Sequence, residues 1–303
     1  MLKRWGIYCK EMYPLIPRVL LGIMLFFEIY FLVLLTNGKT EFNIGISEFV
    51  GGFTVFGFLL LLRIADDFKD YKTDLKLFPK RPLPSGRVTK KDLTALLVID
   101  VAALLVLNIV FMNNIFYFLF LMLYGTLMSL WFFNRKIIQK SLPLALITHN
   151  PIQLIVNLYA ISFTCIKYGV PLISYANILV LFSLYFDGLV WEIGRKIRAP
   201  GTETEYTTYS KIFGYKKPVY FIMAVMLVDL VTSSLMVMEL FKPAVIGTVL
   251  GYVWFFLGCL RFLKNPVKHK IQPLMERYLY VTELYIVVLI VSYLGAAMQP
   301  VKF

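Results

Sequence analysis

The feature that most constrains the fold is a series of nine apolar segments, each long enough to cross a bilayer. A transmembrane helix needs about 20 predominantly apolar residues. The chain is 59% hydrophobic, with a mean hydropathy of +0.73, which is too apolar for a soluble domain of 303 residues. The segments span residues 15–36, 46–65, 92–112, 114–133, 142–164, 171–191, 217–239, 243–263 and 279–298. We therefore expect an all-α integral membrane protein, a single transmembrane domain over residues 1–303 built from about nine helices.

The basic residues predict how this bundle is oriented. All but four of the 31 lysines and arginines lie near the N-terminus, up to residue 18, or in and at the edges of every second connection after the first segment; the exceptions are Lys39, Lys167, Lys242 and Lys302. Cytoplasmic loops are rich in Lys and Arg, so we expect a cytoplasmic N-terminus without a cleaved signal peptide. The long loops at about 63–91 and 187–217 then share the cytoplasmic side. Because the net charge of +13 is dispersed between apolar segments, it indicates topology and an anionic lipid or substrate rather than nucleic acid.

Four acids lie within nine residues at the end of the second segment. If this stretch is helical, Asp66, Asp70 and Asp74 share one face at i, i+4 and i+8, and Asp67 is three residues before Asp70. Like charges at this spacing repel, which favours a cation that neutralises them, and Mg²⁺ takes carboxylate oxygens. A solvated helix end with interleaved lysines would explain the acids alone. It does not explain the loop that follows, LKLFPKRPLPSGRVT.

These residues carry a resemblance to a known family. The stretch DDFKDYKTD, followed by KRPLPSGR, resembles the first signature of the UbiA superfamily of intramembrane prenyltransferases, N-D-x-x-D-x-x-x-D and then R-P-x-x-S-G. Asp66 stands where that family usually has Asn, and one oxygen ligand replaces another. The resemblance implies a cytoplasm-facing polar cap over a central cavity. It also implies that Asp66, Asp67, Asp70 and Asp74 hold Mg²⁺.

The second signature of the family is incomplete in this chain. In its place the chain reads YFDGLVWEIGRKIRAP from Tyr185, where the family has D-x-x-x-D or D-x-x-D-x-x-x-D. Asp187 and Glu192 are candidate metal ligands, although Glu192 is also placed to pair with Arg195 at i, i+3. Two basic residues take the place of a further acid, and two glutamates follow later, which leaves the second metal site open among Asp187, Glu192 and Glu203. The two basic residues are Arg195 and Lys196, and the two later glutamates are Glu203 and Glu205.

The resemblance also suggests residues for the substrate. Basic side chains in the two loops are candidates to contact a diphosphate, although cytoplasmic loops are basic in any membrane protein. The sequence His149-Asn150-Pro151 predicts a kinked span whose polar groups line a pocket, while Asn150 and Asn157 fit interhelical hydrogen bonding equally well. The diphosphate candidates are Lys80, Arg81, Arg87, Arg195, Lys196 and Arg198, and the pocket candidates are His149, Asn150 and Asn157.

Together these observations predict a Mg²⁺-dependent enzyme of a bacterial-type inner membrane. It would ionise an isoprenyl diphosphate and transfer the prenyl group to an aromatic or other lipophilic acceptor, with Asp66, Asp67, Asp70, Asp74 and Glu192 as the catalytic set. The alternative is a UbiA-type terpene cyclase, in which the cation is captured by its own chain. A non-catalytic binder or transporter of an anionic lipid is disfavoured, because a cluster of acids does not bind an anion without a metal. The sequence indicates neither the prenyl length nor the acceptor.

Overall fold

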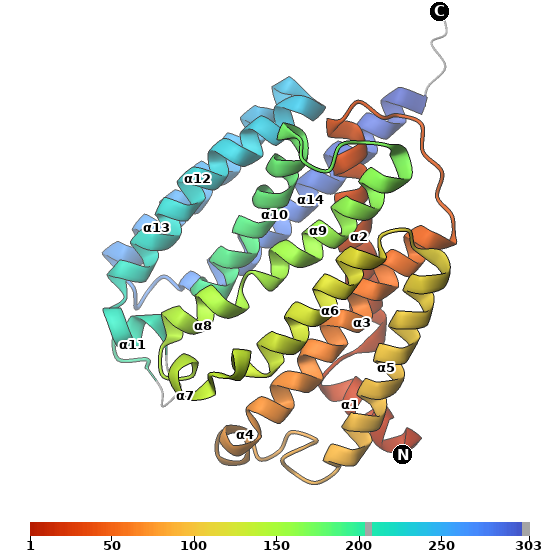
Figure 1. The fold of residues 1–303 in the computed structure, drawn as a ribbon. Coiled ribbons are helices and arrows are strands. Elements are labelled where there is room, and N and C mark those ends of the chain that lie inside the picture. Colours follow the sequence, from red (N-terminus) through yellow and green to blue (C-terminus); the bar gives the residue numbers. More distant parts are fainter. Residues whose placement is uncertain (204–207, 299–303) are drawn as a thin grey trace, which may run out of the picture. The chain divides into compact units, whose positions relative to one another are not determined.

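The computed structural model describes residues 1–203 and 208–298, and the regular elements in this part are all helical (Figure 1). Glu205 lies outside the described residues. The α-helices are α1 (Leu2–Glu11), α2 (Leu15–Thr36), α3 (Ile46–Lys69), α4 (Tyr71–Leu77), α5 (Lys90–Phe111), α6 (Ile115–Ser129), α7 (Arg135–Ile138), α8 (Leu142–His149), α9 (Ile152–Tyr168), α10 (Tyr175–Gly194), α11 (Tyr209–Phe213), α12 (Lys216–Leu240), α13 (Val245–Lys264) and α14 (Ile271–Met298). Two 3₁₀ turns are η1 (Trp131–Phe133) and η2 (Lys242–Ala244).

Eight helical segments in the described part are long and apolar enough to span a membrane, so the chain is a multi-pass integral membrane protein. The remaining one of the nine predicted spans, 114–133, contains the apolar helix α6, which has only 15 residues. At 1.5 Å per residue, α6 is about 22 Å long, short of a hydrocarbon core of about 30 Å. The predicted kink is present, since the segment 142–168 breaks between α8 and α9 at Pro151, which has no amide hydrogen to donate.

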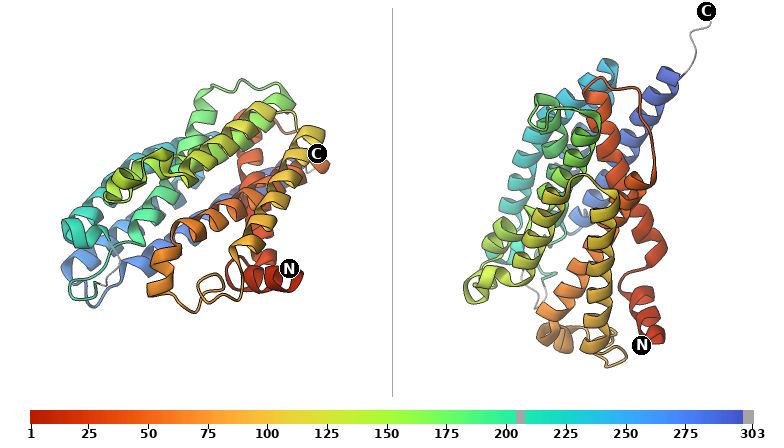
Figure 2. Two further views of the ribbon diagram at one scale, coloured as in Figure 1. Left: turned by 60° about the horizontal axis from the view of Figure 1, so that its bottom comes forward. Right: turned by 45° about the vertical axis from the view of Figure 1, so that its right-hand side comes forward.

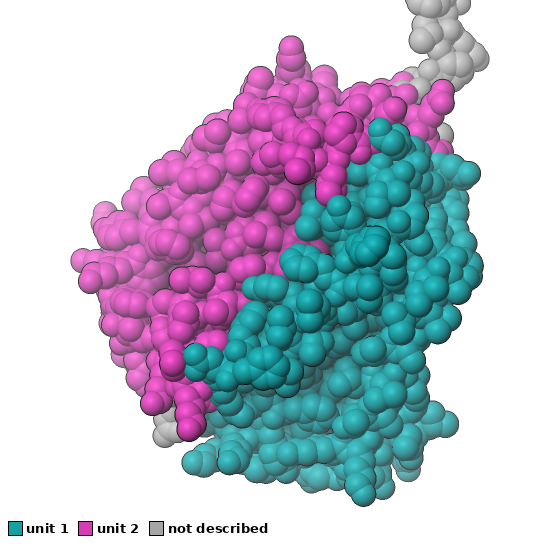
Figure 3. All heavy atoms as spheres, viewed as in Figure 1, with its two compact units in different colours: residues 1–29, 43–135, 158–169 teal, residues 30–42, 136–157, 170–303 magenta. Residues whose placement is uncertain are grey.

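The chain divides into two compact units (Figure 3). The first comprises residues 1–29, 43–135 and 158–169, and within it α3 packs against α5 and α6 while α1 packs against α5 (Figures 1 and 2). Its core includes Tyr8, Phe56, Ile64 and Leu93, all buried. A side chain at Gly52 would place its Cβ 2.8 Å from the Cα of Ile23, so glycine permits close contact between α2 and α3.

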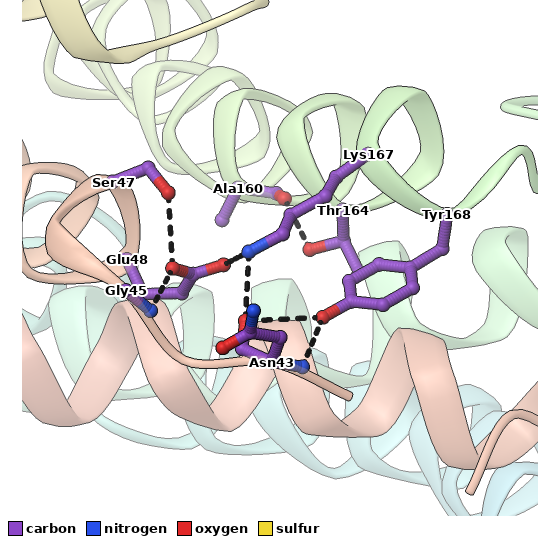
Figure 4. A network of polar contacts seen from close by, with 8 residues as sticks. All are labelled: Asn43, Gly45, Ser47, Glu48, Ala160, Thr164, Lys167 and Tyr168. Carbon is purple, nitrogen blue, oxygen red and sulfur yellow. Dashed lines mark hydrogen bonds and ion pairs between the residues drawn. The ribbon is translucent and has the colours of Figure 1, made fainter. Parts of the chain in front are cut away.

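A buried ion pair closes one end of the first unit (Figure 4). The Glu48 side chain is 0% exposed and pairs with the Lys167 ammonium of α9. It also accepts hydrogen bonds from the Gly45 amide at 2.8 Å and the Ser47 hydroxyl at 3.0 Å, while Lys167 donates to the Asn43 carbonyl at 2.7 Å. These contacts tie the start of α3 to the end of α9.

The second unit comprises residues 30–42, 136–157 and 170–303. Helices α10, α12, α13 and α14 pack against one another, with α10 and α12 in extensive contact (Figure 1). The core is rich in large side chains because the inner faces of four helices meet there; its fully or nearly fully buried members include Val219, Ile222, Met226, Phe255 and Phe262.

We expect α6 to cross the membrane despite its length. Single cysteines in a cysteine-free background at Lys76 and Lys268, which are both exposed, should then be labelled by an impermeant maleimide from the cytoplasmic side. A cysteine at Lys39 should be labelled from the outside. Six crossings between residues 76 and 268 place both on one side. Labelling of the Lys76 and Lys268 positions from opposite faces would mean that α6 does not cross.

Candidate functional site

The first acidic motif spans the junction of two helices. Helix α3 ends at Lys69 and α4 begins at Tyr71, and Asp70 between them has φ of −95° and ψ of 4°, outside both helices. The Asp70 amide donates to the Asp66 carbonyl at 2.9 Å, and the Asp74 amide donates to the Asp70 carbonyl at 2.8 Å. Asp70 thus takes part in both helix ends, but its own backbone is non-helical, so Asp66 and Asp74 belong to separate helices and the single helical face that the sequence predicts stays a prediction.

Asp67 faces a different direction and is buried. Its carboxylate accepts a hydrogen bond from the Tyr8 hydroxyl at 2.6 Å and pairs with the Arg63 guanidinium one turn earlier. Burial, followed by the neighbouring Asp67 charge, raises the pKa of Tyr8, so this phenol remains a hydrogen-bond donor. Asp67 therefore anchors α1 against the end of α3.

Asp66, Asp70 and Asp74 differ in their partners. Asp66 pairs with Lys69 at 3.2 Å, and the Lys69 ammonium also lies 4.9 Å from the centre of the Trp131 ring. Asp74 is buried and pairs with Arg81 at 2.8 Å. Asp70 is exposed and, among the described residues, makes no side-chain hydrogen bond or ion pair. Desolvation of its carboxylate, and then the charge of Asp66, raises the pKa of Asp70.

The basic loop after α4 folds back on the N-terminal helix. Arg87 forms a two-point ion pair with Glu11 of α1, one contact measuring 2.8 Å, and also donates to the Lys80 carbonyl. The hydrogen bond from Arg87 lowers the pKa of Glu11. The Arg81 guanidinium lies 3.9 Å from the centre of the Phe78 ring. Of the three basic candidates in this loop, Arg81 and Arg87 thus have acidic partners within the unit, and the Lys80 side chain is exposed.

The turn η1 lies in the same unit and has an unusual backbone conformation. Trp131, Phe132 and Phe133 have φ values of 56°, 48° and 59°, a left-handed conformation that side chains rarely adopt. Just after the turn, Arg135 donates to the Lys69 carbonyl at 3.0 Å and so satisfies a free carbonyl at the end of α3. This left-handed turn places Trp131 beside Lys69.

The second motif lies in the other unit, at the end of α10. Glu192 pairs with the Arg195 Nε at 2.6 Å and with the Lys196 ammonium at 2.8 Å. Asp187 is buried and lies five residues earlier, which places it about 140° around the helix from Glu192. The structure therefore does not bring Asp187 and Glu192 onto one face. Glu203 accepts a hydrogen bond from the Thr208 hydroxyl at 2.6 Å.

Asp187 instead lies within electrostatic range of Asp229 of α12, which is also buried, and of the partly buried Glu283 of α14. Asp229 is 0% exposed and accepts hydrogen bonds from Tyr252 at 2.8 Å and Ser233 at 3.0 Å. Tyr252 and Ser233 also line a cavity of about 520 Å³ among α12, α13 and α14. Its other aromatic walls are Trp254, Tyr278 and Tyr285.

The pocket candidates at the α8–α9 break are also in the second unit. The His149 Nδ1 is 2.9 Å from the Thr148 hydroxyl, and Asn150 ends α8. The Asn157 side chain donates to the Leu181 carbonyl of α10 at 3.3 Å, which is the interhelical hydrogen bond that Asn commonly makes in bundles. Pocket lining by these residues stays a prediction.

The first motif fits magnesium in the kind of ligand it offers. Asp66, Asp70 and Asp74 offer carboxylate oxygens, the ligand type that Mg²⁺ takes, and Asp70 is exposed. Within the described ranges, however, no three His, Cys, Asp or Glu side chains lie close enough together to hold a metal ion. Asp66 and Asp74 are held by Lys69 and Arg81, so binding a metal would require them to leave these partners.

No protein-family model matches the sequence, and no curated protein matches it. Among solved structures, the chain is similar to a digeranylgeranylglyceryl phosphate synthase, with a TM-score of 0.63 and 16% sequence identity. The match covers 98% of this chain and 100% of that one. That synthase is an intramembrane prenyltransferase of the UbiA superfamily. The chain has a UbiA-type fold. The resemblance seen in the sequence is thereby confirmed for the architecture.

Sequence reasoning missed several residues of the UbiA-type fold that contact the first motif. Tyr8 and Glu11 come from a helix more than 50 residues away, and nothing in their local pattern points to Asp67 or Arg87. Arg63 carried a usable signal, because it precedes Asp67 by four residues on one helix. Trp131 gave none.

The partners of the acids predict different effects on stability. Asp67→Ala leaves Arg63 and Tyr8 without their shared acceptor, so we expect a loss of about 1–3 kcal/mol of folding free energy. Asp70→Ala, at an exposed position, should change stability by about 0.5 kcal/mol or less. Thermal unfolding of the purified variants in one detergent measures both. Equal stability of the two variants would show that the Asp67 contacts do not stabilise the fold.

Proposed function

We propose that the protein is a Mg²⁺-dependent intramembrane enzyme that ionises an isoprenyl diphosphate and transfers the prenyl group to an aromatic or other lipophilic acceptor, releasing diphosphate. One observation carries this proposal: the fold similarity covers 98% of the chain, and the first-signature acids Asp66, Asp70 and Asp74 lie at the junction of α3 and α4. The similar solved structure is that of a prenyltransferase, and it is the reaction class, not its substrate, that we carry over.

Each motif residue has a proposed role. Asp66, Asp67, Asp70 and Asp74 hold magnesium, with Asp70 most accessible and Asp67 also orienting α3 through Tyr8. Bound magnesium would neutralise the negative charge that develops on the leaving diphosphate. Basic side chains of the two loops contact the diphosphate and stabilise the same charge through hydrogen bonds. The proposed contacts are Lys80, Arg81, Arg87, Arg195, Lys196 and Arg198, with Glu192 and Asp187 as further metal ligands.

A second candidate function is terpene cyclisation, in which the carbocation reacts within its own chain. The supporting observation is the cavity of about 520 Å³ with walls of Tyr252, Trp254, Tyr278 and Tyr285. Aromatic faces stabilise cations, and this volume lies within the range of about 300–1,000 Å³ typical of small-molecule sites.

Product analysis distinguishes the two functions. The purified protein is incubated with Mg²⁺ and isoprenyl diphosphates of several chain lengths, with and without a lipophilic aromatic acceptor. Prenyl transfer gives an acceptor adduct and one diphosphate released per adduct. A cyclic hydrocarbon or alcohol formed without acceptor selects the cyclase. Absence of diphosphate release with every substrate would overturn both.

Asp70→Ala should reduce diphosphate release by roughly 100-fold or more, because the most accessible metal ligand is lost while the fold is kept. Glu276→Ala, an exposed acid of α14 outside both motifs, is the control and should retain parental activity. Activity of the Asp70 variant within a few-fold of the parent, with the same sensitivity to chelator, would make the motif an ordinary solvated helix end.

Glu192 and Arg195 should separate metal binding from substrate binding. Glu192→Gln should raise the Mg²⁺ concentration needed for half-maximal rate, because the amide is a weaker ligand. Arg195→Ala should leave that requirement unchanged and reduce kcat/KM by roughly tens- to hundreds-fold. If their ion pair is only a surface contact, each change costs about 1 kcal/mol or less. Magnesium titrations that coincide with the parent for both variants would remove Glu192 from the ligand set.

A further inference from the structure

A small hollow with two basic side chains lies at one end of the second unit. Its volume is about 260 Å³, and it is formed where the chain leaves α10 and where α14 begins. Its polar walls are Arg198, Thr202, Lys270 and Gln272. Its apolar walls include Phe262, Pro266 and Val267.

The two cations are held there by the local fold. The Arg198 amide donates to the Ser210 hydroxyl at 2.7 Å, and its Nη1 donates to the carbonyls of Arg195 at 2.8 Å and Ile197 at 3.2 Å. These bonds use Nη1 and leave Nε and Nη2 without a hydrogen bond among the described residues. The guanidinium is therefore anchored through one nitrogen and retains donors for a ligand.

Lys270 reaches the hollow through an ordered turn. The Asn265 side chain accepts from the Lys268 amide at 3.1 Å, and the His269 amide donates to the Asn265 carbonyl at 3.1 Å. The Gln272 amide group then joins the first turn of α14 to the Arg195 carbonyl at 3.0 Å. Lys270 itself is exposed and forms no ion pair within the described part of the chain.

The surrounding charge favours an anion. Arg198 and Lys270 line one hollow and, in contrast to Arg195 and Lys196, neither pairs with an acid in the described residues. Two like charges around one space repel each other unless an anion lies between them. Helix α14 starts at Ile271 and has 28 residues, so its positive end adds to the attraction.

We infer that this hollow is a phosphate-binding site, formed by Arg198, Lys270, Thr202 and Gln272. Arg198 lines this hollow, whereas Arg195 and Lys196 pair with Glu192. A phosphate group presents oxygens that suit a guanidinium fork and an ammonium. The apolar walls accept the carbon atoms that carry the phosphate, whether these belong to a lipid headgroup or to a free phosphorylated molecule.

Ligand-induced stabilisation of the full-length protein tests the site. The protein is placed in phosphatidylcholine nanodiscs without isoprenyl diphosphate, so the outcome is independent of the proposed reaction. One arm titrates inorganic phosphate at constant ionic strength, and the other increases the fraction of phosphatidic acid in the disc. A ligand that binds the folded state raises the unfolding midpoint. Stabilisation by free phosphate indicates a soluble ligand, and stabilisation by phosphatidic acid alone indicates a lipid headgroup.

Variants then place the binding in the hollow. Lys270→Gln and Arg198→Gln should each weaken the apparent affinity by about tenfold or more, since each removes a charged donor. Lys268→Gln, an exposed lysine of the same turn outside the hollow, should leave it unchanged. If Arg198→Gln fails to fold, Lys270→Gln decides alone. The inference is wrong if neither probe stabilises the parent, or if Lys268→Gln loses as much affinity as Lys270→Gln.

Discussion

The hydrocarbon interior of a bilayer offers no water to backbone amides and carbonyls, and this constraint determines most of what the chain does. Helices satisfy these groups internally, which is why the described residues form helices throughout their regular structure. Most charged side chains lie at the helix ends, although Asp229 and Glu283 lie within α12 and α14. The two signature regions are such ends, and their chemistry follows from how their charges are matched.

The first motif shows two ways of matching a charge. Asp67 is matched internally, by Tyr8 and Arg63, and so has a structural duty in addition to any role in binding. Asp70 is exposed, and the charges of Lys69 and Arg135 favour its ionised form without a direct contact. Because Asp66 and Asp74 carry cationic partners, a metal would compete with Lys69 and Arg81 for them. Exchange of partners is therefore built into the proposed chemistry, with the displaced cations left close to the diphosphate.

The sequence predicted what local pattern determines. The first apolar segment coincides with α2 and the break at Pro151 is present, whereas the helix expected across Asp66, Asp70 and Asp74 is interrupted at Asp70. Contacts between distant segments could not be predicted from the sequence, because the periodicity of one helix does not indicate which helix packs against it. Tyr8 meets Asp67 from a separation of 59 residues. The short α6 and its left-handed end escaped prediction for a different reason, since a positive φ is usually marked by glycine and here falls on Trp131, Phe132 and Phe133.

The pair of Glu48 and Lys167 has a consequence for biosynthesis. The two residues are 119 positions apart, so Glu48 is made and enters the membrane long before the lysine that will neutralise it is translated. During that interval the carboxylate lies at the start of a helix that has begun to insert, where an uncompensated charge is costly. Closure of the Figure 4 network is thus a late assembly event that depends on α9. A chain that ends before residue 167 lacks the ammonium that pairs with Glu48 and cannot complete this network.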